Sequence, residues 1–342
     1  MSERYFVTGA LGCIGAWIVR TLVQRGDTPI VFDMGSDRSR LEAILTADAI
    51  AAVDFVEGDI TDGAAVHRAL ATSGARRVIH LAGVQVPTCR ANPVLGAMVN
   101  VVGTLHLFEA ARTAGVERVA YASSAAVIGE SDDGEGPVSE EGGGEPTTHY
   151  GWFKRTNEGN ARVYYLDHGL SSAGLRPLAV YGVGRDTGVT SDPTEAIRHA
   201  VLGRPFRIRF SGDTDFVYVR DAAEAFVACA DRAPEGAHVF NMHGETAPVA
   251  RFVQLVEETL PKARGLIDVE GAPIPIPPRL DDSALRRAVS GVPSTSLQDG
   301  IAETIERFME LKRRGWWAGE TAASSDASPR RPDGAFGERA LP

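Results

Sequence analysis

The stretch TGALGCIG, residues 8–15, decides the fold of this chain. It follows the apolar run RYFV and precedes the helix-like segment IGAWIVRTLVQRG. A glycine-rich turn between a strand and a helix is the context that a dinucleotide-binding site requires. Gly9 would allow the tight turn, Gly12 would let a pyrophosphate approach the backbone, and Gly15 would let the helix pack closely on the sheet. The pattern predicts a phosphate site at the start of this helix, and a purely structural turn is the alternative.

Asp33 ends the next strand-like run, PIVFD. A carboxylate at this place can accept hydrogen bonds from the ribose hydroxyls of adenosine, and it would repel the 2′-phosphate of NADP. Arg38 follows closely in the sequence and could offset that repulsion. NAD is therefore the expected cofactor, and a plain turn residue is the alternative for Asp33.

Strand-like and helix-like segments alternate along the first part of the chain. The strand-like runs are nearly continuous apolar stretches: RYFVTG, PIVFD, AVDFV, RVIHLAG, RVAYASS and SSAGLRP. Such alternation predicts an α/β fold, a Rossmann-type doubly wound parallel sheet with helices on both faces. After about residue 180 the rhythm becomes irregular, which indicates a smaller mixed C-terminal substrate lobe. We expect an NAD-binding domain over 1–180 that carries the catalytic residues, a substrate-binding lobe over 181–317 whose chain partly returns to the core, and a flexible tail over 318–342.

Ser124, Tyr150 and Lys154 form the candidate catalytic set. Ser124 follows a strand-like run, and Tyr150 and Lys154 lie four residues apart, on one face of a predicted helix. An ammonium about 4 Å from a phenol, at an effective dielectric constant of about 20, contributes on the order of 4 kcal/mol, or up to about three pKa units. The Tyr150 phenolate could then act as a base near neutral pH, while Ser124 stabilises charge on the substrate oxygen. The set predicts hydride transfer at a secondary alcohol, and the alternative is a Tyr–Lys pair on a solvated helix.

Composition and charge narrow the classes of partner. The 342 residues are 44% hydrophobic and 23% charged, which is ordinary for a globular protein, and the formal net charge is −10. An acidic surface repels nucleic acid and anionic membranes, so neither is an expected partner. No run reaches the roughly 18 unbroken apolar residues of a membrane span, and the start MSERYFV is unlike a secretory signal. The scattered Cys13, Cys89 and Cys229 indicate a reduced, cytoplasmic protein and no metal site.

These stretches resemble the extended branch of the short-chain dehydrogenase/reductase superfamily, often called the NAD-dependent epimerase/dehydratase family. The resemblance covers about residues 4–314 and is carried by TGALGCIG, GDI (58–60), HLAG (80–83), NVVGTLHLFEAA (100–111), YASSAAVIG, YGWFK, LRPLAVYG and DFVYVRDAAEAF. It implies an NAD-dependent enzyme with catalytic Ser124, Tyr150 and Lys154. It also implies a homodimer formed through paired helices around 91–114 and 149–168.

The resemblance also implies a set of binding residues. Those expected to bind the cofactor are Gly9, Gly12, Cys13, Ile14, Gly15, Asp33, Asp59, Ile60, Leu81, Ala82, Gly83, Asn100, Tyr150 and Lys154. Those expected to contact the substrate are Ser124, Ala125, His149 and Arg185. A turn residue is the alternative for Asp59 and a helix brace for Asn100, while His80 is expected to be a satisfied core residue.

The chain departs from the nucleotide-sugar enzymes of this family in two places. Those enzymes usually read like RxFNVYGPG after the sixth strand, whereas this chain has Ala179 where an asparagine would contact the diphosphate. They also carry a longer GDGxxxRDFxxVxD segment, whereas FSGDTDFVYVRD is short, with Asp215 before Phe216 where the arginine would sit. A carboxylate that faces a diphosphate would lower the affinity for it.

The main functional expectation is therefore an NAD-dependent oxidoreductase that takes a hydride from a secondary alcohol of a small polar substrate, such as a sugar acid, polyol or hydroxy acid. Arg185 is the candidate partner of a substrate carboxylate. The alternative is a nucleotide-sugar epimerase or dehydratase, such as a UDP-sugar 4-epimerase with tightly bound NAD, in which Arg185, Arg198, Arg207 and Arg209 compensate for the missing diphosphate contacts. A second alternative is a non-catalytic NAD(H)-binding protein.

Overall fold

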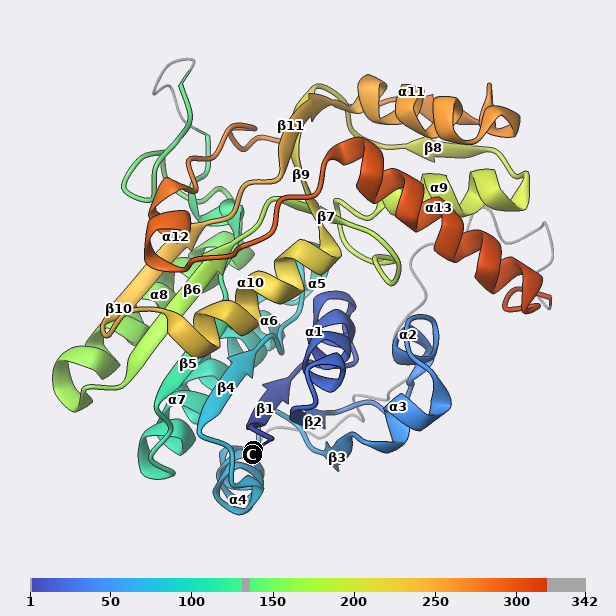
Figure 1. The fold of residues 1–342 in the computed structure, drawn as a ribbon. Helices are drawn as coiled ribbons and strands as arrows, with labels where there is room; N and C mark the ends of the chain where they lie inside the picture. Colours follow the sequence, from blue (N-terminus) through green and yellow to red (C-terminus); the bar gives the residue numbers. More distant parts are fainter. Residues whose placement is uncertain (1, 131–135, 319–342) are drawn as a thin grey trace.

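A seven-stranded parallel sheet lies at the centre of the computed structural model, which describes residues 2–130 and 136–318 (Figure 1). Its strands are β1 (Arg4–Thr8), β2 (Thr28–Asp33), β3 (Asp54–Glu57), β4 (Arg77–His80), β5 (Arg118–Ala122), β6 (Ser171–Arg176) and β10 (Ala237–Asn241). Their order in space is β10-β6-β5-β4-β1-β2-β3, and every neighbouring pair is parallel. The six strand-like runs of the sequence are β1 to β6, so the predicted doubly wound sheet is confirmed.

Helices cover both faces of this sheet. One face carries α1 (Cys13–Gln24) and α10 (Val219–Arg232), and the other carries α4 (Gly63–Ser73), α7 (Gly103–Thr113) and α8 (His149–His168). Alternation along β1 accounts for the two layers, because successive side chains of a strand point to opposite faces. Tyr5 and Val7 pack in one core cluster with Trp17, whereas Phe6 packs in the other with Phe108.

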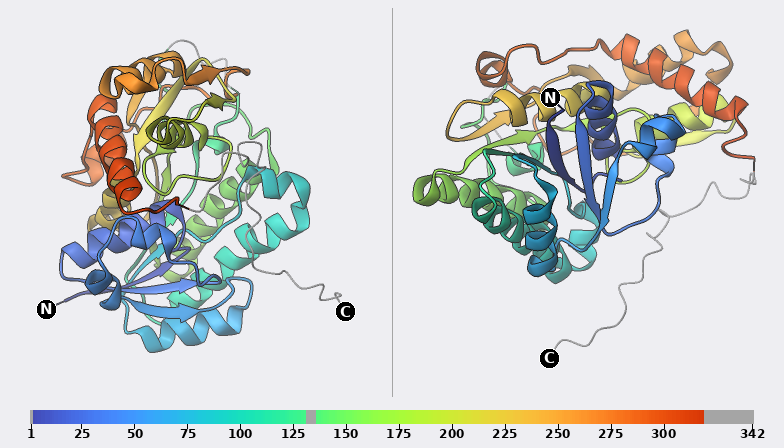
Figure 2. Two further views of the ribbon diagram at one scale, coloured as in Figure 1. Left: turned by 90° about the vertical axis from the view of Figure 1, so that its right-hand side faces the viewer. Right: turned by 60° about the horizontal axis from the view of Figure 1, so that its bottom comes forward.

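The smaller lobe is built from short strands and three longer helices, as the irregular second half of the sequence indicates. Its sheets contain β7 (Ala179–Tyr181), β9 (Asp213–Tyr218) and β11 (Glu245–Pro248), and β8 (Phe206–Ile208) paired with β12 (Ile267–Val269). Its helices are α9 (Asp192–Leu202), α11 (Val249–Thr259) and α13 (Leu297–Arg313). In the left view of Figure 2 this lobe lies above the central sheet. Between its parts, α10 and β10 return to the central sheet. The exact domain boundaries stay a prediction, and the predicted tail, apart from Ala318, lies outside the described residues.

Several short elements have no clear periodicity in the sequence. They are α2 (Ser39–Glu42), α3 (Ala47–Ala51), α5 (Val86–Ala91), α12 (Ser283–Ala288) and the 3₁₀ turns η2 (Ala125–Val127) and η3 (Pro261–Ala263). The amphipathic α11 was not predicted either. These elements connect the longer ones, and α5 and η2 border the carboxyl ends of β4 and β5.

One long helical run contains a π-helical turn. It consists of α6 (Pro93–Ala97), the π-helix η1 (Met98–Val102) and α7. The widened turn contains the buried Asn100, whose backbone oxygen accepts hydrogen bonds from Asn157 Nδ2 (2.7 Å) and Thr104 Oγ1 (2.7 Å). By length and composition Pro93–Thr113 could cross a membrane, but 50% of its apolar window is buried inside the protein. Packing against the core therefore accounts for its hydropathy.

Candidate functional site

The glycine turn between β1 and α1 leaves no room for side chains on its inner side. Gly9 has a positive φ of 66°, and a Cβ there would lie 2.5 Å from the Ala82 nitrogen. A Cβ on Gly15 would lie 2.4 Å from the Gly9 oxygen. On Gly12 it would meet only that same oxygen, at 3.1 Å, so the outer side of the turn is open. This cradle, with α1 beginning at Cys13, fits the pyrophosphate of a dinucleotide.

The Asp33 carboxylate lies at the carboxyl end of β2, beside the glycine turn. It accepts hydrogen bonds from the backbone nitrogens of Leu11 (3.0 Å) and Gly35 (3.2 Å). Arg38 does not pair with it, because the Arg38 guanidinium carbon lies 3.7 Å from the centre of the Phe55 ring. The carboxylate is thus fixed beside the glycine turn, and its negative charge is not offset by Arg38. Its contact with an adenosine ribose stays a prediction.

Three further residues predicted to bind the cofactor are Asp59 and Ile60, which follow β3, and Asn100, which lies in η1. Asp59 accepts a hydrogen bond from the Thr61 nitrogen (2.8 Å), and Ile60 is buried. Asn100 Oδ1 accepts from the Val84 nitrogen (3.0 Å), and its Nδ2 donates to the Val84 oxygen (2.9 Å). Asp59 therefore fills the turn role that was its alternative, and Asn100 braces the loop after β4. Contacts of both residues with a cofactor stay predictions.

The loop after β4 closes this part of the site. Leu81, Ala82 and Gly83 lead from β4 toward α5, and the first two are half-buried. A Cβ on Gly83 would lie 2.7 Å from Asn100 Oδ1 and 3.7 Å from Lys154 Nζ. The loop backbone thus passes close to the candidate catalytic lysine.

Ser124, Tyr150 and Lys154 meet at the carboxyl end of β5, as the sequence predicts. Thr148 caps α8 by accepting a hydrogen bond from the Gly151 nitrogen, which fixes the turn that carries Tyr150. The Ser124 and Tyr150 hydroxyls are hydrogen-bonded to each other. Lys154 is buried, its Nζ donates to the Ala122 oxygen (2.7 Å), and it lies 5.6 Å from the centre of the Tyr150 ring.

The electrostatics of this set differ from the prediction in one respect. Burial raises the pKa of Tyr150, while its hydrogen bond with Ser124 and the charge of Arg185 lower it, and the net direction is upward. The expected lowering by Lys154 is not found, because the ammonium is turned toward the Ala122 oxygen. Burial also lowers the pKa of Lys154 to about 8, so its charge is held at neutral pH but lost soon above it.

The other predicted side chains are placed as follows. His80 is buried between Thr8 Oγ1 (2.6 Å) and Thr104 Oγ1 (3.0 Å), and burial lowers its pKa to about 3, so it is a satisfied core residue as expected. Ala125 is fully buried, so its side chain offers no surface to a substrate.

Two further predicted substrate contacts border the site. His149 is exposed at the start of α8 and stacks on Phe153 at a ring distance of 6.0 Å. Arg185 is half-buried, and its Nη2 donates to Thr190 Oγ1 (3.0 Å). Substrate contacts at both positions stay predictions.

The prediction that Asp215 faces the substrate is wrong. Asp215 is fully buried in β9, the middle strand of the three-stranded sheet, where it accepts a hydrogen bond from the Gly244 nitrogen (3.0 Å) and lies 3.1 Å from His243 Nδ1. Its carboxylate therefore points into the lobe. Ala179 in β7 is 1% exposed and offers no polar atom to a ligand.

Three of the four arginines that could replace the missing contacts are engaged with carboxylates. Arg198 pairs with Glu195, Arg207 with Glu270, and Arg209 with the buried Asp192. Arg185 alone of the four lies near the catalytic set, where its charge acts on Tyr150.

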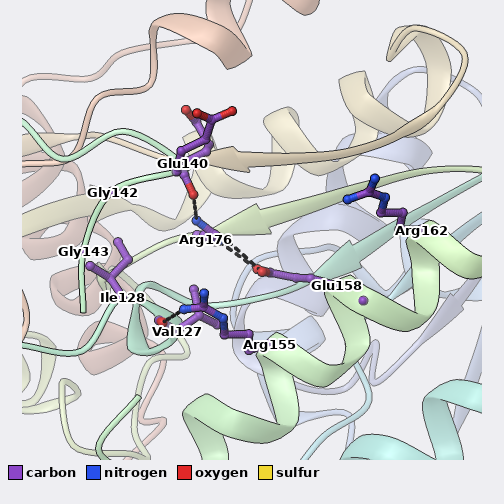
Figure 3. Close-up of a pocket in the computed structure, with 11 residues that line it drawn as sticks. Val127, Ile128, Glu140, Gly142, Gly143, Arg155, Glu158, Arg162 and Arg176 are labelled. Atoms are coloured by element: carbon purple, nitrogen blue, oxygen red, sulfur yellow. Dashed lines mark hydrogen bonds and ion pairs between the residues drawn. The ribbon is translucent and has the colours of Figure 1, made fainter. Parts of the chain in front are cut away.

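A cavity of about 340 Å³ that the sequence did not indicate lies between α8 and the segment that precedes it (Figure 3). None of its lining residues is a predicted site residue: they are Val127, Ile128, Glu140, Glu141, Gly142, Gly143, Arg155, Glu158, Gly159, Arg162 and Arg176. Glu158 and Arg176 form a bidentate ion pair there, with side chains that are each 9% exposed. Their only signal in the sequence is that Glu158 follows Lys154 by one helical turn.

Comparison with known proteins agrees with this geometry. The sequence model described as the NAD dependent epimerase/dehydratase family matches residues 5–242. A UDP-glucose 4-epimerase of Mycolicibacterium smegmatis is 32% identical over 321 residues, which cover 89% of this chain and 98% of that protein.

Solved structures give the same result. The UDP-glucose 4-epimerase of Thermus thermophilus in complex with NAD is 27% identical and superposes with a TM-score of 0.76, covering 90% of this chain and 99% of that one. MoeE5 in complex with UDP-glucuronic acid and NAD is also 27% identical, with a TM-score of 0.75 over 92% of this chain and 100% of that one.

Proposed function

The chain belongs to the NAD-dependent epimerase/dehydratase family, and from this premise we propose that it is a UDP-sugar 4-epimerase. The observation that carries the proposal is the match over 98% of the Mycolicibacterium smegmatis UDP-glucose 4-epimerase, which includes the smaller lobe. The hydrogen-bonded Ser124 and Tyr150, with Lys154 one helical turn away, support the same chemistry. The comparisons favour this reading over the small-substrate dehydrogenase that the sequence alone favours.

The residues of the site have distinct roles in such a reaction. When bound, NAD would supply the hydride acceptor for the carbinol carbon of the sugar and the donor from which the hydride returns to the other face of that carbon. Tyr150 as phenolate would take the hydroxyl proton and later give it back. Because the hydride is returned as well, no net oxidation results. Ser124 would donate a hydrogen bond to the oxygen that becomes a ketone, and its hydrogen bond with Tyr150, together with the charge of Arg185, would favour the phenolate. Lys154, which is among the residues expected to bind the cofactor, would donate from its ammonium to the nicotinamide ribose. Two further parts of the site would bind the cofactor without reacting. The pyrophosphate would lie on the turn at Gly9, Gly12 and Gly15, and the adenosine ribose would bind the Asp33 carboxylate.

One observation supports a second candidate function, a dehydrogenase of a small substrate. Ala179 is buried and apolar, and aligning the family pattern RDF on Phe216 puts the buried Thr214 at the position of the arginine. Neither side chain could grip a diphosphate. A dehydrogenase of a small sugar acid, polyol or hydroxy acid, with Arg185 near the reacting carbon, would need no such grip.

A substrate panel separates the two functions. The purified protein is incubated with UDP-glucose and UDP-galactose, and separately with NAD and simple sugar acids, polyols or hydroxy acids. Interconversion of the UDP-sugars without accumulation of free NADH is the expected result. NADH accumulation with a small substrate, and no change in the UDP-sugars, would overturn the epimerase and support the dehydrogenase. In either case Tyr150→Phe should abolish turnover and leave NAD bound.

We further propose that the protein acts in the cytoplasm as a homodimer. Large apolar side chains are exposed on the neighbouring helices α6, η1 and α8: Val94 (69%), Met98 (42%), Trp152 (44%), Val163 (53%) and Leu166 (67%). These helices are the ones expected to pair with a second copy, and a shared surface would cover the exposed apolar area. The cysteines of the described residues are free, which fits a reducing compartment.

A further inference from the structure

Three consecutive residues at the end of β5 each bond to a different residue of α8. The three partners are four residues apart, so they lie on one face of the helix. The pairs are Ser124 with Tyr150, the Ala122 oxygen with Lys154 Nζ at 2.7 Å, and Ser123 Oγ with Glu158 Oε1 at 2.5 Å. The first two pairs belong to the proposed reaction, and the third has no assigned role.

Arg176 of β6 holds the third pair from the other side. Its Nε and Nη2 donate to the two oxygens of Glu158, each at 2.7 Å, and its Nη1 donates to the Glu140 oxygen at 2.9 Å (Figure 3). Glu140 Oε1 in turn accepts from the Asn241 nitrogen at 3.0 Å. Glu158 is therefore fixed to β5 and β6 at once, and through Glu140 to the segment that leads into α8.

We propose that Glu158, held by Arg176 and Ser123, is the positioning residue of this active site. It fixes β5 against α8 and thereby sets the positions of Ser124 and Lys154. Its carboxylate also balances the charge of the Lys154 ammonium. The inference rests on the proposed function, because it takes Ser124 and Lys154 as groups of the active site. Burying an ion-pair network costs free energy, since each charge loses its hydration. Beside a lysine that must stay charged, the network can offset this cost by stabilising the ammonium.

The charges around Lys154 single out Glu158. The titratable groups near its ammonium are Cys89 of α5, His80 of β4, and Tyr150 and Glu158 of α8. Burial holds His80 neutral, and burial raises the pKa of the Cys89 thiol above its ordinary value, so neither carries a full charge at neutral pH. Among the described residues that act on Lys154, Glu158 is thus the one that the structure shows in an ion pair.

The test reads the Lys154 ammonium directly. The chain has three lysines, Lys154, Lys262 and Lys312, so ¹³Cε labelling of lysine gives three NMR signals, and Lys154→Met identifies one of them. In Glu158→Gln, measured with NAD bound, the titration midpoint of that signal should fall by about one pH unit. The rate of UDP-glucose conversion at pH 9, relative to that at pH 7, should fall up to about tenfold for the same reason. Glu109→Gln is the matched control, because Glu109 also pairs with an arginine and contacts α8 through Tyr164, but at the surface.

The outcomes separate this inference from the proposed function. An unchanged Lys154 titration in Glu158→Gln, with Tyr150→Phe inactive, would overturn the inference and leave the function standing. Turnover by Tyr150→Phe would overturn the function itself. If Glu158→Gln does not fold, Ser123→Ala tests the positioning role, because it removes only the hydrogen bond between Glu158 and Ser123 of the β5 end. Its kcat should fall by about three- to tenfold at unchanged KM, and a kcat within twofold of the wild type would refute the positioning role.

Discussion

Replacing Lys154 by methionine should make the protein inactive and, at neutral pH, more stable. Burial lowers the pKa of Lys154 from its ordinary 10.5 to about 8, so folding must hold the ammonium in an environment that disfavours it. The gap between 10.5 and about 8 corresponds to roughly 3 kcal/mol of lost stability wherever both states are protonated, that is below about pH 8. Methionine removes that cost, but it leaves the Ala122 oxygen without its donor, which costs about 1–2 kcal/mol. The net gain is about 1–2 kcal/mol at pH 7.

The stability difference between Lys154→Met and the wild type should depend on pH, in a direction that the pKa of Lys154 sets. Because the pKa of Lys154 is lower in the folded than in the unfolded state, the unfolded chain binds more protons between about pH 8 and 10.5. The wild type therefore gains stability from this group as the pH rises through that window, and Lys154→Met does not. The advantage of the variant should shrink steadily above pH 8.

Urea unfolding of nucleotide-stripped protein at pH 6.5 to 9.5 measures this difference. Stripping matters because bound NAD would add its own charges beside Lys154. A variant that is less stable than the wild type at pH 7, or a stability difference that does not change with pH, would refute the reasoning. Glu109→Gln, remote from the lysine, should show no such trend.

Three other predictions follow from the same structure. Asp33→Ala should weaken NAD binding and shift the NAD-over-NADP preference by about tenfold or more, because it removes a charged acceptor of the ribose hydroxyls; equal selectivity in wild type and variant, measured by fluorescence titration, would remove that role. Gly15→Ala should cost about 1–3 kcal/mol in the free energy of urea unfolding, because its Cβ would lie 2.4 Å from the Gly9 oxygen, and wild-type stability would contradict the packing argument. Leu166→Glu should convert the proposed dimer to a monomer in sedimentation velocity at unchanged fold, because a charge would enter the apolar face beside Val163; a variant that sediments as the wild type would speak against this interface.

Local patterns in the sequence were enough to predict the central sheet and the meeting of Ser124, Tyr150 and Lys154, whose roles stay predictions. A glycine turn, an acid at the end of β2 and a Tyr–Lys pair one helical turn apart each constrain neighbours in the chain. Ser124 follows β5, and Tyr150 lies in the first turn of α8, the next long helix of the chain, so the two meet at the carboxyl end of β5. The predicted six strands and this juxtaposition were confirmed for that reason.

Contacts between distant segments could not be predicted in the same way. Glu158 and Arg176 look like ordinary polar residues of a helix and a strand end, and only the packing of α8 on β6 makes them a buried pair. The prediction for Asp215 was wrong for the opposite reason. Its position in a motif suggested contact with a ligand, whereas β9 is the middle strand of its sheet and Asp215 is buried there. The pKa of Tyr150 likewise depends on burial and on Arg185, which the spacing of Tyr150 and Lys154 does not reveal.

The π-helical turn η1 adds one residue to its helix. Removing one residue between Met98 and Val102 would restore regular α-helical winding and leave the buried face of α7 in place, because a π-helical turn takes up its extra residue by wider winding. The loss would fall on Asn100, whose bonds with Val84 and Asn157 are made from the widened turn. A one-residue deletion in this run should therefore give a folded protein with a loosened loop after β4, so the extra residue serves the neighbouring loop and not the continuity of the helix.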